Sequence, residues 1–273
     1  RRKLRLIKKV PWFWRFADPL LDKINTYRIG KGLRYANGIF VNSTYTFQKL
    51  INCYPELENR CRIAPPAIRD EFFETARPTP EVGGAPKRLK FIVVARLASA
   101  APKKNVDGIL RALSYVQNDV DFDAVVVGDG DKRKAYEDLA SELMLNSRVK
   151  FIGSVGVEKV IAEMDQAHLL IQPSRASAKD IESFGMVYAE AAARGVPSLA
   201  SRAGGAIDAV QHDRTGIVIE DSSPESIANG IREFVRKRRS FDPSDIRAFA
   251  ENFRWASVVA EMRQFMEERL SNG

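Results

Sequence analysis

Residues 91–130 read FIVVARLASAAPKKNVDGILRALSYVQNDVDFDAVVVGDG, and this stretch decides the fold class. Apolar runs at 91–95 and 122–127 flank the amphipathic segment 106–116. Strands that are apolar on both faces, separated by helices of about ten residues, are typical of a parallel sheet with helices on both sides. The stretch therefore predicts a strand, a helix and a second strand of a parallel α/β sheet.

The same alternation continues to residue 237. Further strands are expected at 149–155, 168–174, 196–201 and 215–220, and helices at 134–145, 158–167, 185–195, 206–213 and 223–237. This pattern predicts a doubly wound, Rossmann-like domain. Ligands of such sheets bind at the carboxyl ends of the strands, so the loops after each strand are the expected place for chemistry.

A smaller piece precedes this domain. Residues 35–70 predict two strands, at 37–43 and 59–68, joined by a helix at 44–54. Two strands cannot form a sheet with a core of its own, so this piece needs a larger partner layer. The Pro- and Gly-rich stretch 76–88 is interpreted as a linker, and residues 255–270 predict an amphipathic helix.

The positive charge of the chain is concentrated at one end. The formal net charge is +8, but residues 1–34 hold eleven basic and two acidic residues, whereas the remaining 239 residues carry 32 basic and 33 acidic ones. A nucleic-acid-binding enzyme usually spreads positive charge over a folded face, so no nucleic-acid partner is expected. The segment also holds Trp12, Phe13, Trp14 and Phe16, which fits an interfacial element on an anionic membrane. The alternative is a helix of an incomplete domain whose aromatic side chains pack inward.

Composition and apolar patterning limit the cell compartments in which this protein is expected. No apolar stretch reaches the roughly 20 residues of a membrane span, and the basic start lacks the apolar core of a signal peptide. Cys53 and Cys61 are too few for a disulfide framework and are interpreted as reduced thiols. A cytoplasmic protein is expected, with a peripheral position on the inner face of the membrane where residues 1–34 dock. The chain opens on Arg1 rather than Met, which suggests a processed or truncated chain.

The strongest candidate site is PSRASAKDIESFGMVYAEAAARGVPSLAS, residues 173–201. A helix is expected to begin near Gly185, with Glu182 in the loop before it and Glu190 between one and two turns along it. Backbone N–H groups and the helix dipole at that terminus offer a site for a diphosphate, and Gly185 lets a ligand approach. The two carboxylates can accept hydrogen bonds from sugar or ribose hydroxyls. The alternative is that Glu182 caps the helix and Glu190 is solvated.

Three cations are expected beside the same diphosphate. Arg96 follows the first strand directly, and Lys103 and Lys104 precede the next helix. Loops that follow a strand of a parallel sheet lie at its carboxyl edge, where the helix terminus also lies. The alternative is an ordinary solvated charged face.

The run VVVGDG, which ends at Gly130, resembles half of a dinucleotide fingerprint. The third glycine of that fingerprint is missing, so a simple tight turn at Gly128 is favoured. Asp129 and Asp131 form an Asp-x-Asp pair, but no other metal-type ligands cluster near them in the sequence, and no metal site is expected. His168 and His212 have no Ser or Cys partner and are interpreted as structural.

Together these segments resemble glycosyltransferase family 4, whose members are retaining, nucleotide-sugar-dependent enzymes of the GT-B fold. The resemblance is carried by Arg96-Leu97, Lys104-Asn105-Val106-Asp107, VVVGDG, RVKFIG, the segment 173–201, GGAIDAV and TGIVIE. The wording PSR…DIESFGMVYAEA is especially similar to bacterial mannosyltransferases and related enzymes that build lipid-linked and surface glycans.

The resemblance implies a role for each candidate residue. Arg96 and Lys104 would neutralise the departing diphosphate, and Lys103 would share or replace Lys104, because the loop is longer than the family's usual spacing. Glu182 would bind hydroxyls of the donor sugar, and Glu190 the ribose. The remaining donor contacts would come from the backbone N–H groups of Phe184, Gly185 and Met186, the turn at Gly128, and Ile152 in the loop after Phe151. No metal or other cofactor is implied.

The resemblance also implies how the chain is organised and what it does. The expected parts are a partial acceptor domain at 1–85, a donor-binding domain at 86–254, and a helix at 255–273 that crosses back onto the acceptor domain. The implied activity moves a sugar, with retention, to a lipid-linked or glycan acceptor in cell-surface polysaccharide or glycolipid synthesis. The alternatives are a nucleotide-sugar-binding subunit that needs a second chain to supply the acceptor domain, and a non-enzymic membrane-surface module.

Overall fold

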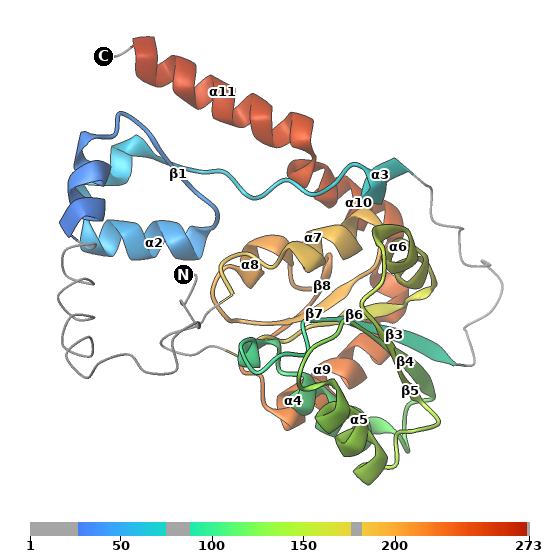
Figure 1. Cartoon of the computed structure of the whole chain (residues 1–273). Helices are drawn as coiled ribbons and strands as arrows, with labels where there is room; N and C mark the ends of the chain where they lie inside the picture. Colours follow the sequence, from blue (N-terminus) through green and yellow to red (C-terminus); the bar gives the residue numbers. More distant parts are fainter. Residues whose placement is uncertain (1–26, 75–87, 176–181, 272–273) are drawn as a thin grey trace, which may run out of the picture.

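The computed structural model describes residues 27–74, 88–175 and 182–271. The aromatic residues at 12–16 and residues 76–87 of the predicted linker lie outside these ranges. Figure 1 shows the arrangement of the described elements.

The main body is built on one parallel sheet of six strands. Its spatial order is β5-β4-β3-β6-β7-β8, and every neighbouring pair runs parallel. The strands are β3 Leu89–Val94, β4 Phe122–Val127, β5 Val149–Gly153, β6 Leu169–Ile171, β7 Ser198–Ser201 and β8 Gly216–Ile219. The chain order reverses between β3 and β6, which is the point where doubly wound sheets bind their ligands. The predicted fold class is therefore confirmed.

Helices cover both faces of this sheet. The face with α4 and α9 also carries α5, and the opposite face carries α6, α7 and α10. The bounds are α4 Val106–Val116, α5 Arg133–Glu142, α6 Val157–Gln166, α7 Met186–Ala193, α8 Ala206–Ala209, α9 Pro224–Lys237 and α10 Pro243–Ala250. Short 3₁₀ turns lie at η2 Pro102–Lys104, η3 Arg238–Ser240 and η4 Glu251–Phe253. With both faces covered, all residues of β6 and β7 are buried.

Local sequence signals explain where the helices begin and end. Ser223 caps α9 by accepting a hydrogen bond from Ser226 N–H, and Pro224 occupies its first turn. The basic residues Arg236 and Lys237 lie in its last turn, where the helix dipole favours positive charge. Sequence analysis overlooked α10, although Asp242 caps it in the same way and Pro243 begins it. The helix expected at 206–213 is shorter than predicted, because α8 ends at Ala209.

The N-terminal part is small and depends on other elements for its packing. It contains a helical segment 27–35, the parallel strands β1 Ile39–Val41 and β2 Cys61–Ile63, the helix α2 Thr44–Cys53, the turn η1 Pro55–Arg60 and the short helix α3 Glu71–Glu74. No residue of α2 is fully buried. This matches the expectation that two strands need a partner layer.

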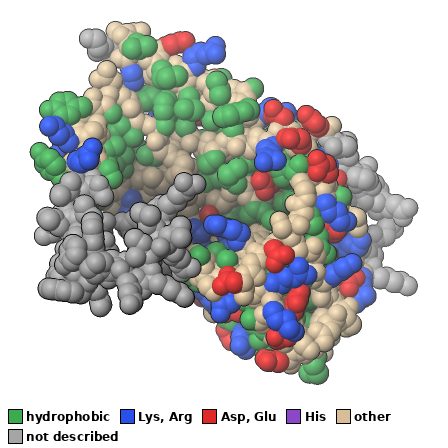
Figure 2. Space-filling model, viewed as in Figure 1, with side chains coloured by type: hydrophobic (Ala, Val, Ile, Leu, Met, Phe, Trp, Pro, Cys, Tyr) green, Lys and Arg blue, Asp and Glu red, His purple; other side chains and the backbone are tan. Residues whose placement is uncertain are grey.

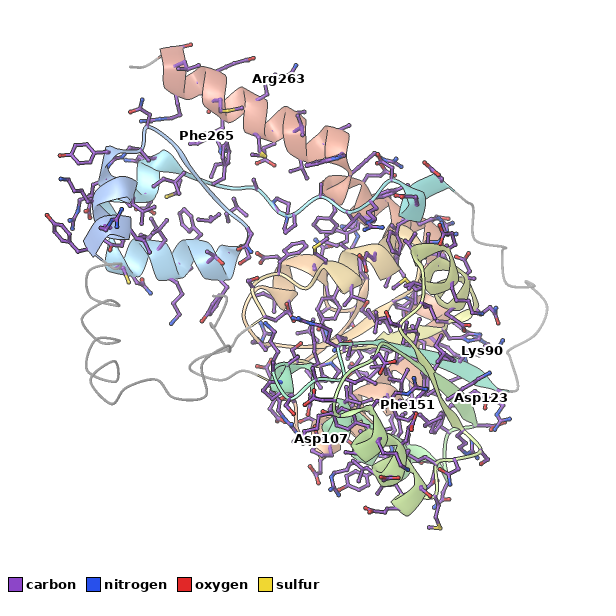
Figure 3. The ribbon with its side chains drawn as sticks, viewed as in Figure 1. Lys90, Asp107, Asp123, Phe151, Arg263 and Phe265 are labelled. Carbon is purple, nitrogen blue, oxygen red and sulfur yellow. The ribbon has the colours of Figure 1, made fainter. Side chains whose placement is uncertain are left out.

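The C-terminal helix supplies part of that layer. Helix α11, Trp255–Ser271, extends from the main body over the N-terminal part (Figure 1). Phe265 points toward β1 and Arg263 away from it (Figure 3), and the Phe265 ring meets Phe40 edge-on with centroids 5.3 Å apart. Arg269 Nε also donates to the Asn37 carbonyl at 2.9 Å. The helix therefore packs on the N-terminal part.

A buried arginine joins the two parts a second time. Arg194, which follows α7, is 1% exposed. Its Nε and Nη2 donate to the two carboxylate oxygens of Asp165 at 2.8 and 3.0 Å, and its Nη1 donates to the Phe72 carbonyl at 3.0 Å. Phe72 belongs to α3, so this side chain ties the N-terminal part to the helical face of the sheet.

Replacing Arg194 by Ala should lower the free energy of unfolding by about 3 kcal/mol, because it removes two charged hydrogen bonds to Asp165 and leaves the buried Phe72 carbonyl without this donor. Urea denaturation measures the change. The matched control is Arg202→Ala, which removes an ion pair to Glu220 in which both side chains are more than half exposed. That loss should stay below about 1 kcal/mol. Equal losses in the two variants would contradict the conclusion that Arg194 holds the N-terminal part on the main body.

Candidate functional site

The candidate site lies at the carboxyl ends of β3, β4 and β5. A pocket of about 370 Å³ opens there. It is lined by Val94, Ala95, Arg96, Lys104, Val127, Gly128, Asp129, Ser154, Val155 and Val160. Three of the predicted residues, Arg96, Lys104 and Gly128, thus share one pocket. Ile152 does not line it, because β5 continues to Gly153 and the loop that reaches the pocket begins at Ser154.

A glycine turn closes the floor of this pocket. Gly128 has φ +133°, and a Cβ at this position would lie 1.9 Å from the Ala95 carbonyl oxygen. Its N–H donates to the Gly153 carbonyl at 2.8 Å, which joins the ends of β4 and β5. Only glycine permits this close approach of three strand ends.

Asp129 and Asp131 are engaged by the protein itself. Asp129 accepts hydrogen bonds from Gly130 N–H at 2.8 Å and from Arg133 Nη1 at 3.3 Å. Asp131 accepts from the backbone N–H and the hydroxyl of Ser99, and these bonds lower the pKa of its carboxyl. Both carboxylates therefore fix loops. The expectation that no metal binds here stays a prediction.

Among the described residues, one other group of side chains could share an ion. His212, Asp213 and Glu233 lie close together near the surface. Lys237 Nζ already contacts both acids of this group, each at 2.8 Å. His212 Nδ1 accepts from Val218 N–H at 3.0 Å, as expected for a structural histidine. A lysine thus occupies the position that a cation would need.

The loop that carries Lys103 and Lys104 is held by hydrogen bonds to neighbouring loops. Lys103 and Lys104 lie in η2, and their carbonyls accept hydrogen bonds from Arg175 N–H at 2.8 Å and Gln172 Nε2 at 3.3 Å. Asn105, with φ +52°, ends this turn, and its Nδ2 donates to the Pro173 and Ser222 carbonyls. The loop after β6 thus fixes the loop after β3 through one backbone hydrogen bond and through bonds donated by the side chains of Gln172 and Asn105.

Sequence analysis did not single out these positioning residues. Gln172 and Asn105 are almost fully buried polar side chains, and Arg175 forms a two-pronged ion pair with Asp107 at 2.9 and 2.8 Å. Asn105, Asp107 and Arg175 lie in segments that carry the family resemblance, and Gln172 is a polar residue at the end of a buried strand, but none of these signals gave the residues a positioning role. Their partners are far away in the sequence, so the contacts could not be derived from spacing.

Lys104 is already paired in this structure. Its Nζ lies 2.7 Å from Glu182 Oε2, and the two side chains are 20% and 11% exposed. Two predicted site residues that are distant in the sequence therefore meet at one point. A diphosphate that bound Lys104 would compete with Glu182 for the same ammonium group.

Helix α7 begins beside this ion pair. Gly185 precedes it with φ +84°, in a conformation that would push a Cβ to 2.6 Å from the Tyr188 ring. No side chain caps the helix, and Tyr188 N–H donates to the Gly185 carbonyl at 3.0 Å, so within the described residues the N–H groups of Met186 and Val187 remain without an acceptor. The alternative reading, in which Glu182 caps the helix, is wrong because Glu182 pairs with Lys104.

The side chains beside Gly185 point in different directions. Phe184 is 2% exposed and packs edge-on against Phe253 with centroids 5.4 Å apart, whereas Met186 is 44% exposed. The sequence predicted that Phe184 and Met186 contact the nucleotide-sugar donor through their backbone N–H groups rather than through their side chains. The packing of Phe184 anchors the loop from which those N–H groups project.

Glu190 lies on the next turn of α7 and is partly shielded from water. Burial raises the pKa of its carboxyl, and the positive charges of Arg69 and Lys104 act against this shift. Within the described part of the chain its carboxyl has no hydrogen-bond partner. The alternative of a fully solvated Glu190 is therefore wrong. Arg69, from the N-terminal part, is a nearby cation that sequence analysis missed.

The raised pKa of Glu190 predicts a pH-dependent cost. The folded protein holds the proton to a higher pH than the unfolded chain, so stability falls as pH rises through the interval between the two pKa values and is fully reduced above it. Glu190→Gln does not carry this cost. The melting temperature of the variant should therefore exceed that of the wild type at pH 8, with a smaller difference at pH 4. A difference that does not change with pH would contradict this account.

The fold and the site together define a class of protein. Cations and an uncapped helix N-terminus at the switch point of a doubly wound sheet are the parts of a domain that binds nucleotide phosphates. The chain belongs to the family described as glycosyl transferases group 1, whose family model matches residues 80–266. The predicted resemblance is confirmed at the level of this family.

Known relatives agree with this assignment. The chain is 27% identical, over 250 residues, to a GDP-mannose-dependent alpha-(1-6)-phosphatidylinositol monomannoside mannosyltransferase of Mycobacterium tuberculosis, covering 88% of this chain and 63% of the relative. A glycosyltransferase structure from Rickettsia africae has a TM-score of 0.72 at 19% identity, covering 86% of this chain and 64% of that one. A structure of Anabaena HepE in complex with UDP and glucose has a TM-score of 0.67 at 23% identity, covering 87% and 64%.

Proposed function

We propose that this protein moves a sugar from a nucleotide-sugar donor to a lipid-linked or glycan acceptor, with retention of configuration, in cell-surface polysaccharide or glycolipid synthesis. The observation that carries the proposal is the meeting of Arg96, Lys104, Glu182 and the open start of α7 at one edge of the sheet. The printed activity of the Mycobacterium tuberculosis relative supports it. The chain spans less than two thirds of that relative's length, so the activity of the whole relative enters here as a proposal.

The chemistry required is stabilisation of a leaving diphosphate. Arg96 and Lys104 supply positive charge, and the first N–H groups of α7 supply preorganised donors aimed at phosphate oxygens. Glu182 accepts hydrogen bonds from sugar hydroxyls, and Glu190 from the ribose. These groups act by position and charge, so the proposed mechanism needs no protein nucleophile and no metal.

The ion pair between Lys104 and Glu182 gives this mechanism an order of events. In this structure the charges of Lys104 and Glu182 neutralise each other at 2.7 Å. When the diphosphate takes Lys104, the Glu182 carboxylate loses its cation and becomes available to sugar hydroxyls. Binding of the phosphates thus prepares the residue that holds the sugar.

Replacing Lys104 by Ala should weaken the binding of GDP or UDP roughly ten- to a hundredfold, since a hydrogen bond to a charged group contributes about 1.5–3 kcal/mol. Calorimetry with GDP, UDP, GDP-mannose and UDP-glucose measures this and identifies the donor base. Lys134→Ala is the matched control, because Lys134 is an exposed lysine of α5 that pairs with Asp138. It should leave binding unchanged.

Glu182→Gln should separate the two steps. Without the competing carboxylate, binding of the diphosphate alone should stay equal or become tighter, while the nucleotide sugar should lose affinity. Equal weakening of both ligands would contradict the proposed exchange of partners. Wild-type protein that bound no nucleotide at all would contradict the proposed function.

A second candidate function is a donor-binding subunit that needs another chain to supply the acceptor half. Among the described residues the N-terminal part contributes two strands, which favours this reading. A transfer assay with radiolabelled sugar separates the candidates. Nucleotide binding with weak transfer supports the subunit, and robust transfer by this chain alone contradicts it.

We also propose that the basic N-terminal segment places the protein on an anionic membrane surface, at the inner face where a lipid-linked acceptor would lie. The helical segment 27–35 exposes Tyr27, Ile29 and Tyr35 at 71%, 61% and 77%, with Arg28 and Lys31 also exposed. Exposed aromatic and basic side chains together suit a lipid–water interface. None of the helices in the described ranges has the length and apolar character of a membrane span.

Liposome flotation tests the membrane proposal. The protein should float with vesicles that contain phosphatidylserine and not with phosphatidylcholine alone. The double substitution Arg28→Glu and Lys31→Glu should weaken binding at least about tenfold, since each basic residue near the surface contributes about 1 kcal/mol. The control is Lys132→Glu with Lys134→Glu, on the donor body. Equal binding to neutral vesicles would contradict the electrostatic part.

A further inference from the structure

One acidic side chain of the main body contacts the N-terminal part directly. Asp208 lies in α8, and its Oδ2 accepts a hydrogen bond from the backbone N–H of Thr44 at 2.5 Å. Thr44 is the first residue of α2, and Ser43 caps the same helix by accepting from Thr46 N–H at 3.1 Å. Asp208 therefore adds a second acceptor, with a negative charge, at the positive end of this helix.

The segment that carries Asp208 also holds the loop of Glu182. Gly205 N–H donates to the Glu182 carbonyl at 2.8 Å. The Gly205 backbone is wedged so closely that a Cβ would lie 2.0 Å from the Ser183 carbonyl oxygen and 2.7 Å from Ser43 Cβ. Segment 205–208 thus contacts the Glu182 loop on one side and the start of α2 on the other.

A second pocket, of about 330 Å³, lies between the two parts at this place. It is lined by Thr44, Ile63 and Pro65 from the N-terminal part and by Phe184, Ile207, Asp208, Gln211 and Phe253 from the main body. Figure 2 shows a hollow between the part formed by α2, β1 and α11 and the main body. Asp208 is the charged member of this lining, and its hydrogen bond spans from one part to the other.

The two parts also meet elsewhere: Phe265 of α11 packs on Phe40, and two hydrogen bonds join segment 68–72 to the main body. Ile68 N–H donates to the Phe253 carbonyl at 3.0 Å, and Arg194 reaches Phe72. In Figure 1, α3 and α10 lie at the end of α7 opposite α8. Of these contacts, the bond of Asp208 is the one whose main-body residue lies in segment 205–208, the stretch that holds the Glu182 loop.

We propose that Asp208 is a positioning residue for the donor sugar. By joining the start of α2 to the stretch that holds the Glu182 loop, it fixes Glu182 in the place from which that carboxylate meets sugar hydroxyls. This inference rests on the proposed function. The proposed diphosphate contacts also include Arg96, Lys104 and Glu190, which lie outside segment 205–208, so the loss of Asp208 should weaken the nucleotide sugar more than the nucleoside diphosphate.

The test compares two ligands in three variants. In Asp208→Ala, calorimetry should show at least about fivefold weaker binding of the nucleotide sugar, GDP-mannose or UDP-glucose, the lower end of typical coupling between sites. Binding of GDP or UDP should change less than twofold. Asp208→Asn, which keeps an acceptor without the charge, should lie between, and Asp208→Glu should restore part of the loss. Asp245→Ala, at an exposed acid of α10, is the matched control.

Amide hydrogen exchange gives a readout that needs no ligand. Asp208→Ala should speed exchange at Thr44, whose N–H donates to Asp208, and at Gly205, whose N–H lies in the same segment 205–208 and donates to the Glu182 carbonyl. Exchange in the strands of the sheet should not change. Equal weakening of both ligands, or unchanged exchange at Thr44 and Gly205, would overturn the inference. If the wild type binds no nucleotide, the proposed function fails, and the exchange rates still decide whether Asp208 joins the two parts.

Discussion

Strands β3 and β6 pair side by side, and this pairing sets where the charged groups of the site lie. Phe91 faces Leu169 and Ile92 faces Leu170 in parallel register. Because both strands are buried between helices on both faces, a slip would disrupt close packing on each side. The register therefore brings the loop of Lys104 beside the loop that begins at Gln172. The hydrogen bonds from Gln172 and Arg175 to the lysine loop exist only because these two strand ends meet.

The site holds its charges in a prepared arrangement. Lys104 and Glu182 balance each other at 2.7 Å, and both are largely shielded from water. Glu190, one turn along α7, carries a raised pKa because burial disfavours its ionised form. Arg96 lines the same pocket and, within the described ranges, has no acidic partner. Under the proposed function, an incoming diphosphate would meet one available cation and one that changes its partner, in a pocket whose shape the glycine turn at Gly128 already fixes.

The N-terminal part relates to this site through three kinds of contact. Phe265 of α11 packs on Phe40, the buried Arg194 reaches Phe72, and Asp208 meets the start of α2. The contacts of Phe265 and Arg194 anchor the N-terminal part, and the contact of Asp208 lies beside the loop that carries Glu182. The positive charge of Arg69, from the same part, also acts to lower the pKa of Glu190 against the effect of burial. The small N-terminal part is therefore mechanically and electrostatically coupled to the donor pocket even though it contributes little core of its own.

The amino-acid sequence determined the alternation of strands and helices, the start of α7 at Gly185 and the family, because each is written in local periodicity or in a continuous motif. The residues at the strand ends, Arg96, Lys104 and Gly128, could also be placed, since a parallel sheet gathers such ends at one edge. Tertiary structure alone decided that Lys104 pairs with Glu182, that Arg194 is buried on Asp165, and that Asp208 touches Thr44. These contacts join residues far apart in the chain, and their geometry depends on how whole elements pack, which no local pattern encodes.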